Sequence, residues 1–163
     1  MKDRITVALE ALVGLALLRS GTAAGMVSFL FGSPGDEPTD AESSLHLQCP
    51  WRIVSADRIV VASSDVFFPG DDRADIETFD PGEEPSLFEN RVSEWFDATD
   101  PHSRTVTGVR ADTLGGFVVL LRGGATLEAF PAHSLRGHYS EFWRLLRPGA
   151  RHFVVTGDGI EET

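Results

Sequence analysis

The chain of 163 residues is long enough to fold around one hydrophobic core, and its apolar content of 42% excludes wholesale disorder. Its formal net charge of −11 excludes non-specific binding to nucleic acid, because the phosphates of a duplex would repel it. The single cysteine rules out an internal disulfide, so nothing in the composition asks for an oxidising compartment.

The acidic residues gather in the first two thirds of the chain. Residues 1–103 carry 19 acidic and 7 basic side chains, whereas residues 104–151 carry 7 arginines and 3 carboxylates. An excess of negative charge steers the approach of a basic protein and favours binding to one. The alternative, that the charge only keeps the protein in solution, is equally compatible with the composition.

The N-terminal segment has an apolar run from Ile5 to Leu18 that follows basic residues, an outline that resembles a secretory signal. Its polar residues, however, lie at helical spacing along one stripe: Asp3, Thr6, Glu10 and Gly14. A narrow polar stripe is typical of a mostly buried core helix, and the run is too short to span a bilayer. We therefore expect a long N-terminal helix in a cytoplasmic protein that has no membrane partner.

Strand and loop patterns follow this helix. Residues 26–31 (MVSFLF) predict a strand, and a polar loop rich in Pro and Gly comes after it at 32–44. Further strands are expected at 45–54 and 58–62, separated by a connection of hairpin size. Residues 69–86 then form a long acidic loop.

A short helix is expected directly after the acidic loop. The apolar residues of the segment 87–96 (LFENRVSEWF) recur at helical spacing, so that they share one face. Ser86 is the expected N-cap, and Glu89, three residues later, completes the capping-box pattern.

The last third of the chain is rich in strands. The pairs Gly115-Gly116 and Gly123-Gly124 are turn signals between three apolar segments, and the segments 141–149 and 151–159 pair across Pro148-Gly149. Short connections favour antiparallel neighbours. The sequence therefore predicts one α+β domain over 1–163. Its curved, mostly antiparallel sheet of about six to eight strands would pack against the long N-terminal helix and the shorter one.

The stretch LHLQCPWRI, residues 45–53, holds the only cysteine and a histidine three residues before it. Because side chains alternate along a strand, Leu45, Leu47 and Cys49 face one way and His46 faces the other. Cys49 is therefore expected to be a small core residue. The alternative, in which Cys49 is a nucleophile and another part of the fold supplies its base, stays open.

The sequence contains no motif of a metal or cofactor site. Its five histidines are scattered, and His133 and His138 come nearest to a pair: His46, His102, His133, His138 and His152. The acidic run 71–80 fails as an EF-hand loop, because Ile76 and Gly82 stand where glycine and glutamate are required. A looser cation site in this run stays open. We predict no metal, no cofactor and no catalytic residue, and the glycine pairs lack the order of phosphate loops.

Several segments resemble a family of small uncharacterised bacterial proteins: LHLQCPWRIV, IVVASSDVFFP, GGFVVLLRGGATLEAFP and EFWRLLRPGARHFVVTGDGIE. The resemblance covers nearly the whole chain except the acidic loop, and it implies no activity. The layout of strand, glycine pair and strand, followed by an aromatic-Trp-Arg segment, is also similar to several immunity proteins of bacterial toxin systems. That likeness rests on architecture.

Two hypotheses of function follow. In the first, the protein is a non-catalytic binding domain of the immunity type, and its acidic loop mimics a nucleic-acid backbone and blocks the cleft of a basic toxin or other basic protein. The carboxylates expected to contact the partner are Asp71, Asp72, Asp75, Glu77, Asp80, Glu83 and Glu84. Four phenylalanines in or beside the loop would either anchor the interface or fill the core: Phe67, Phe68, Phe79 and Phe88.

In the second hypothesis, the protein is an enzyme or binds a small ligand in a pocket on the curved sheet. The residues expected to line this pocket come from one strand end and from across the sheet: His46, Gln48, Trp51, Arg52, Arg144 and His152. An apolar cavity on which these polar groups converge would favour this hypothesis.

Overall fold

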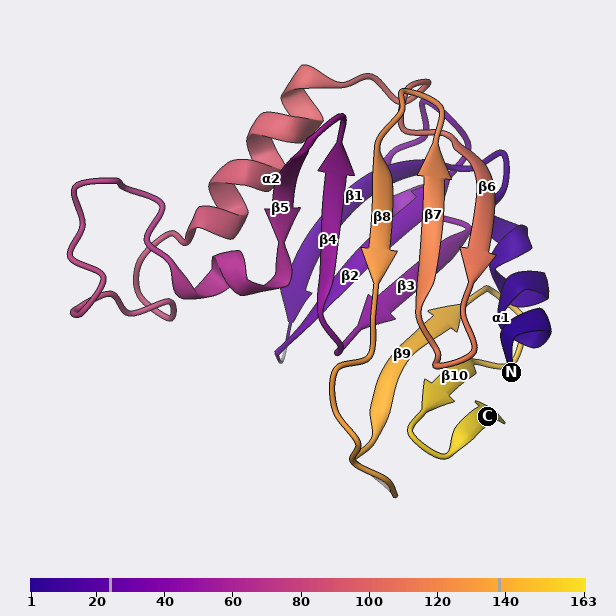
Figure 1. The fold of residues 1–163 in the computed structure, drawn as a ribbon. Helices are drawn as coiled ribbons and strands as arrows, with labels where there is room; N and C mark the ends of the chain where they lie inside the picture. Colours follow the sequence, from indigo (N-terminus) through magenta and orange to yellow (C-terminus); the bar gives the residue numbers. More distant parts are fainter. Residues whose placement is uncertain (24, 138) are drawn as a thin grey trace.

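The protein is described by a computed structural model that covers residues 1–23, 25–137 and 139–163. Over these residues the chain forms two antiparallel β-sheets and two α-helices, α1 (Lys2–Leu9) and α2 (Leu87–Ala98) (Figure 1). None of the helices in the described part is long and apolar enough to cross a membrane.

The two sheets contain six and five strands. The larger has the order β1-β2-β3-β9-β10-β11, with bounds Ala16–Ala23, Met26–Gly32, Ser43–Leu47, Glu141–Leu146, Phe153–Thr156 and Gly159–Glu162. The smaller has the order β5-β4-β8-β7-β6, with bounds Arg58–Ala62, Trp51–Ser55, Thr126–Ala129, Phe117–Leu121 and Val106–Ala111. All pairings in the two sheets are antiparallel, as short connections favour.

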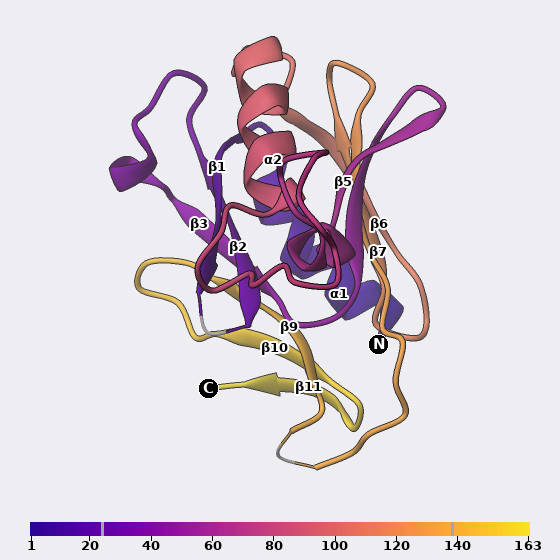
Figure 2. The same ribbon diagram turned by 90° about the vertical axis from the view of Figure 1, so that its left-hand side faces the viewer.

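The sheets lie face to face with the hydrophobic core between them (Figures 1 and 2). Alternate residues of β3, Ser43, Leu45 and Leu47, are buried in this core, so that the residues between them face outward. Trp143 on β9 is fully buried, and its indole N–H donates a 2.7 Å hydrogen bond to the carbonyl of Gly115. The buried indole N–H of Trp143 thus has a hydrogen-bond acceptor within the core.

The chain passes from one sheet to the other at residues 48–50. Here the backbone N–H groups of Gln48 and Cys49 both donate to the carbonyl of Phe142, over 2.9 and 3.0 Å. Pro50 has no N–H group to extend the ladder of β3, and β4 starts at the next residue in the other sheet. This corner places Trp51 at the edge of the core, beside the end of β3.

Hydrogen bonds from the side chain of Arg104 connect the start of β1 to the end of α2. Its Nε donates to the carbonyl of Leu17 over 2.9 Å, and its Nη1 donates to the carbonyl of Thr99 over 2.6 Å. The guanidinium also lies 4.6 Å from the ring centre of Phe96. Arg104 is only 7% exposed, and burial lowers the pKa of its guanidinium while Asp100 raises it by a smaller amount.

The prediction of an α+β protein with antiparallel strands is confirmed, but the prediction of a single curved sheet is wrong. A strand forms at 16–23, where the expected helix would have extended to Leu18, and a further unpredicted strand forms at 159–162. The expected strand 45–54 is two strands in different sheets. The reason for the split is Pro50, which ends the ladder. The expected hairpins at both glycine pairs and across Pro148-Gly149 are confirmed.

The prediction of a long N-terminal helix is also wrong. The α-helix ends at Leu9, a single 3-10 turn (Glu10–Leu12) follows, and the apolar residues after it enter strand β1. Gly14 has a φ of +90°, a conformation that lies outside the helical region and suits glycine. The second helix is confirmed, with Ser86 as its N-cap and Glu89 in the capping box.

Candidate functional site

The acidic loop, residues 69–86, connects a 3-10 helix, η3 (Ser63–Phe67), to α2 and extends away from both sheets (Figure 1). Its two ends are hydrogen-bonded to each other. The backbone N–H of Gly70 donates to the carbonyl of Pro85 over 2.9 Å, and that of Leu87 donates to the carbonyl of Phe68 over 2.8 Å. The side chain of Asn90 on α2 also donates to the Gly70 carbonyl over 2.8 Å. The loop is therefore closed at its base.

All seven carboxylates predicted to contact a partner are exposed in this loop: Asp71, Asp72, Asp75, Glu77, Asp80, Glu83 and Glu84. Three of these carboxylates form Asx turns: Asp71, Asp75 and Asp80. Each accepts a hydrogen bond of 2.8–2.9 Å from the backbone N–H of the residue two positions later. Among the described residues, none of the seven forms an ion pair. The loop therefore presents negative charge that forms no ion pair with any side chain in the described part of the chain.

The four phenylalanines near the loop differ in how far they are exposed to solvent. Phe67 and Phe68 are 68% and 43% exposed, and Phe79 is half-buried. Phe88 is buried in the core, where its ring meets that of Trp51 edge-on at 5.9 Å. Phe67 and Phe68 are thus available to a partner, whereas Phe88 fills the core. Ile76, at 55% exposure, is a further apolar side chain on the loop.

The six residues expected to line a pocket on the sheet occupy three different places. Gln48 and Trp51 line a pocket at the corner between the sheets. Arg52 is half-buried on β4, and its Nε lies 2.7 Å from a carboxylate oxygen of Glu128 on β8. The other three, His46, Arg144 and His152, belong to the six-stranded sheet or adjoin it.

His46 and Arg144 are direct cross-strand partners on β3 and β9, and they face away from the core. Arg144 pairs with Glu141, with its Nε 2.6 Å from one carboxylate oxygen. Burial lowers the pKa of His46 and the charge of Arg144 lowers it further, whereas the charge of Glu141 raises it by a smaller amount. The imidazole of His46 thus lies beside an arginine–carboxylate pair whose two charges shift its pKa in opposite directions. No group of three or more potential metal ligands occurs among the described residues, and His138 lies outside them.

Cys49 is buried, as predicted, although it lies at the corner between β3 and β4 and not in a strand. Burial raises the pKa of its thiol to about 12, because a thiolate would lose its hydration there. A nucleophilic cysteine has a depressed pKa and a cationic neighbour. The opposite shift at Cys49 favours the structural role over the catalytic alternative.

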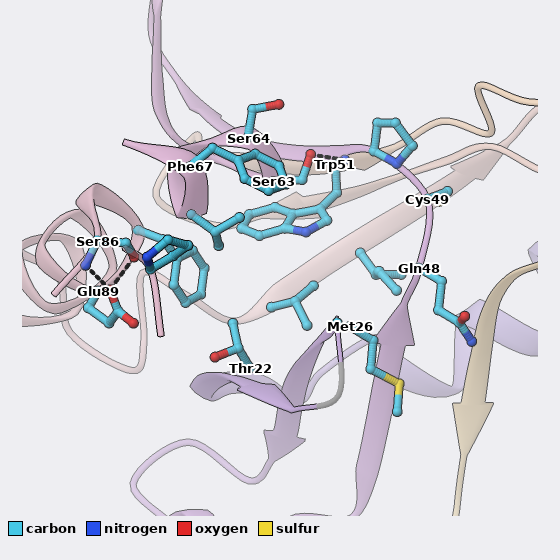
Figure 3. Close-up of a pocket in the computed structure, with 17 residues that line it drawn as sticks. Thr22, Met26, Gln48, Cys49, Trp51, Ser63, Ser64, Phe67, Ser86 and Glu89 are labelled. Atoms are coloured by element: carbon cyan, nitrogen blue, oxygen red, sulfur yellow. Dashed lines mark hydrogen bonds between the residues drawn. The ribbon is translucent and has the colours of Figure 1, made fainter. Parts of the chain in front are cut away.

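The pocket at the corner has a volume of about 490 Å³ and is bounded by four separate segments of the chain (Figure 3). These are the turn between β1 and β2, the end of β3 with the start of β4, the 3-10 helix η3, and residues 81–89. Its wall is mainly apolar and includes Trp51, Phe67 and Phe88. Sequence reasoning found Gln48 and Trp51 but missed the other segments, because only the tertiary fold brings them together.

Comparisons with protein-family models, with curated proteins and with solved structures found no match to this chain.

Proposed function

We propose that the protein binds a basic partner protein through its acidic loop, in the manner of an immunity protein that blocks a toxin. The observation that carries this proposal is the set of seven exposed carboxylates in residues 71–84, none of which is ion-paired within the described chain. Arg73 is the one basic residue in the same segment. An unneutralised patch of this kind steers and orients a positively charged partner.

Apolar side chains beside the charges supply a second kind of contact. Phe67 and Phe68 are exposed at the point where the loop begins, next to the carboxylates that would line the rim. Interfaces commonly have a small apolar or aromatic centre, which contributes most of the affinity, inside a polar rim. This arrangement fits a partner that carries an apolar recess within a basic surface.

The closed base of the loop favours tight binding. The bonds from Gly70 to Pro85 and from Leu87 to Phe68 hold the two ends together, and the three Asx-type turns give the loop internal order. A segment that is already ordered loses less conformational entropy when it binds. The carboxylates would thus meet the partner in nearly their unbound arrangement.

Affinity capture from the lysate of the host tests the proposal when two charge variants are compared. The loop variant neutralises four exposed carboxylates that accept no hydrogen bond from a described residue, and it leaves the Asx turns intact: Asp72→Asn, Glu77→Gln, Glu83→Gln and Glu84→Gln. The control variant makes the same change of net charge at exposed sites elsewhere: Glu37→Gln, Asp40→Asn, Asp57→Asn and Asp97→Asn.

The expected result is one basic protein that the wild type and the control variant retain at low salt, and that high salt releases. The loop variant should retain much less of it. If that partner is a toxin, its activity should also fall when the wild-type protein is added in equal amount. Equal retention by the loop and control variants would contradict the proposal, because net charge alone would then explain the capture.

The alternative function, binding of a small ligand, is favoured by one observation. The pocket beside Trp51 is largely apolar and lies within the usual size range of ligand sites, about 300–1,000 Å³. Its location is the corner between the two sheets.

A further inference from the structure

The indole of Trp51 brings a hydrogen-bond donor to the wall of the corner pocket. The side chain is largely buried, with 4% of the residue exposed, and no described residue accepts a hydrogen bond from its Nε1–H. Of the other two buried tryptophans, Trp143 donates its indole N–H to the carbonyl of Gly115 over 2.7 Å, whereas the indole N–H of Trp95 also has no acceptor among the described residues. Buried indole N–H groups usually have an acceptor, because an unpaired one loses its hydrogen bond to water without compensation. The Nε1 atom of Trp51 is not one of the fully buried atoms without a partner, which among the described residues are the hydroxyls of Ser20 and Ser44. Its N–H is therefore accessible from the pocket and free to donate to a molecule bound there.

The unpaired N–H belongs to the wall of the corner pocket. Figure 3 shows the indole nitrogen of Trp51 on the side of the ring that faces Met26 and Gln48. The indole also packs against two aromatic neighbours, since the rings of Phe29 and Phe88 lie nearly perpendicular to it with centroid distances of 5.0 and 5.9 Å. The ring is therefore fixed in an orientation that directs its donor into the pocket.

The charges and polarity of the wall define the ligand further. Among the described residues, those that line the pocket include the carboxylate of Glu89 and no lysine, arginine or histidine. An anion would therefore find no cationic partner there and would meet additional negative charge from the acidic loop. The remaining surface is mainly aliphatic and aromatic, which favours an apolar molecule.

We infer that this pocket binds a small, neutral, apolar molecule with a hydrogen-bond acceptor such as a ketone or ester carbonyl. The carbonyl oxygen accepts the bond from Trp51 Nε1, and the apolar body lies against Val27, Leu47 and Phe88. The amide of Gln48 at the mouth of the pocket contacts any second polar group. This inference rests on the ligand-binding alternative and names its ligand class. The pocket shares Phe67 with the surface proposed for the partner and includes Pro81 and Ser86 of the acidic loop, but none of the loop's seven carboxylates lines it. The tests of the two proposals therefore change different groups.

Nuclear magnetic resonance of the uniformly ¹⁵N-labelled protein tests the inference on the wild type. The three indole N–H signals are well separated from the backbone signals, and they are assigned through contacts to neighbouring side chains. The probe is acetophenone, a neutral aromatic ketone. Ethylbenzene is the matched molecule without an acceptor, and benzoate is the matched anion.

Acetophenone is expected to move the Trp51 indole signal downfield in a saturable way and to leave that of Trp143 unchanged. Ethylbenzene should bind about three- to tenfold more weakly, the factor that one missing hydrogen bond produces. Benzoate should bind more weakly than acetophenone. An unmoved Trp51 signal, equal affinities for the ketone and the hydrocarbon, or tighter binding of benzoate would each overturn the inference.

The variant Trp51→Phe gives a second test, because phenylalanine keeps an apolar ring and removes the donor. It should lower the affinity for acetophenone by about the same three- to tenfold and leave the affinity for ethylbenzene unchanged. An equal loss for both probes would show that the ring shape, and not the N–H, is responsible. The titration of the wild type decides the question if this variant does not fold. A failed titration also leaves the capture result of the acidic loop untouched, so the two proposals fail separately.

Discussion

Replacing Cys49 with alanine should change how the stability of the fold depends on pH. Burial raises the pKa of the thiol from its ordinary value of 9.0 to about 12 in the folded chain, whereas the unfolded chain keeps the ordinary value. Between these two values the folded state holds a proton that the unfolded state has lost. The stabilisation from the neutral thiol is therefore complete below pH 9 and is lost as the pH rises toward 12.

The size of the effect follows from the two pKa values. Stability falls by about 1.4 kcal/mol for each pH unit above 9, which gives a loss of roughly 2.7 kcal/mol by pH 11. The variant Cys49→Ala lacks this dependence. At neutral pH it should itself be less stable than the wild type by about 1 kcal/mol, because it loses the contacts of the buried sulfur.

Urea unfolding of both proteins, followed by tryptophan fluorescence under reducing conditions, measures the difference. Other groups that titrate in this range are common to both proteins, so their contributions cancel when the two free energies of unfolding are subtracted. The wild type should be the more stable protein at pH 7 and the less stable one at pH 11. A difference that stays constant from pH 7 to pH 11 would show that the thiol ionises normally in the folded state, and the reasoning about its burial would be refuted.

Three other substitutions test the packing by the urea midpoint. Arg104→Met should lower the free energy of unfolding by about 2–3 kcal/mol, because it removes the hydrogen bonds that join β1 to α2. The loss is limited because the substitution also removes a charge that burial disfavours. The exposed Arg19→Met is the control and should stay within about 0.5 kcal/mol of the wild type. Trp143→Phe should cost about 2–3 kcal/mol, through the lost bond to Gly115 and the space left by the smaller ring, and a loss below about 1 kcal/mol would contradict this packing. Ser86→Ala should cost about 1 kcal/mol at the start of α2, and an unchanged midpoint would show that the cap contributes nothing.

Features of the fold that depend on neighbouring residues were predictable from the sequence. The paired glycines at 115–116 and 123–124 permit tight turns, and the strands on either side pair as expected. The alternation in Leu45, His46 and Leu47 correctly assigned the buried and outward faces of β3. The capping box at Ser86 located the start of α2. In each case the deciding interaction lies within a few residues along the chain.

Features that depend on distant contacts were not predictable. The run Leu15–Leu18 is apolar at every position, so its periodicity fits a buried strand as well as a buried helix, and pairing with β2 decides the outcome. The division of the protein into two sheets depends on where the chain turns at Pro50. The unpaired indole N–H of Trp51 follows from the absence of an acceptor among the described neighbours, which come from four segments of the fold.

The proposal that the acidic loop binds a basic partner is tested most directly by the association rate constant of the captured protein. This rate should be measured with the wild type, the loop variant and the charge-matched control variant, at low and at high salt. The account predicts that the loop variant associates about tenfold more slowly at low salt, that the control variant resembles the wild type, and that the three rates converge at high salt. Loop and control variants with the same association rate at low salt would contradict it.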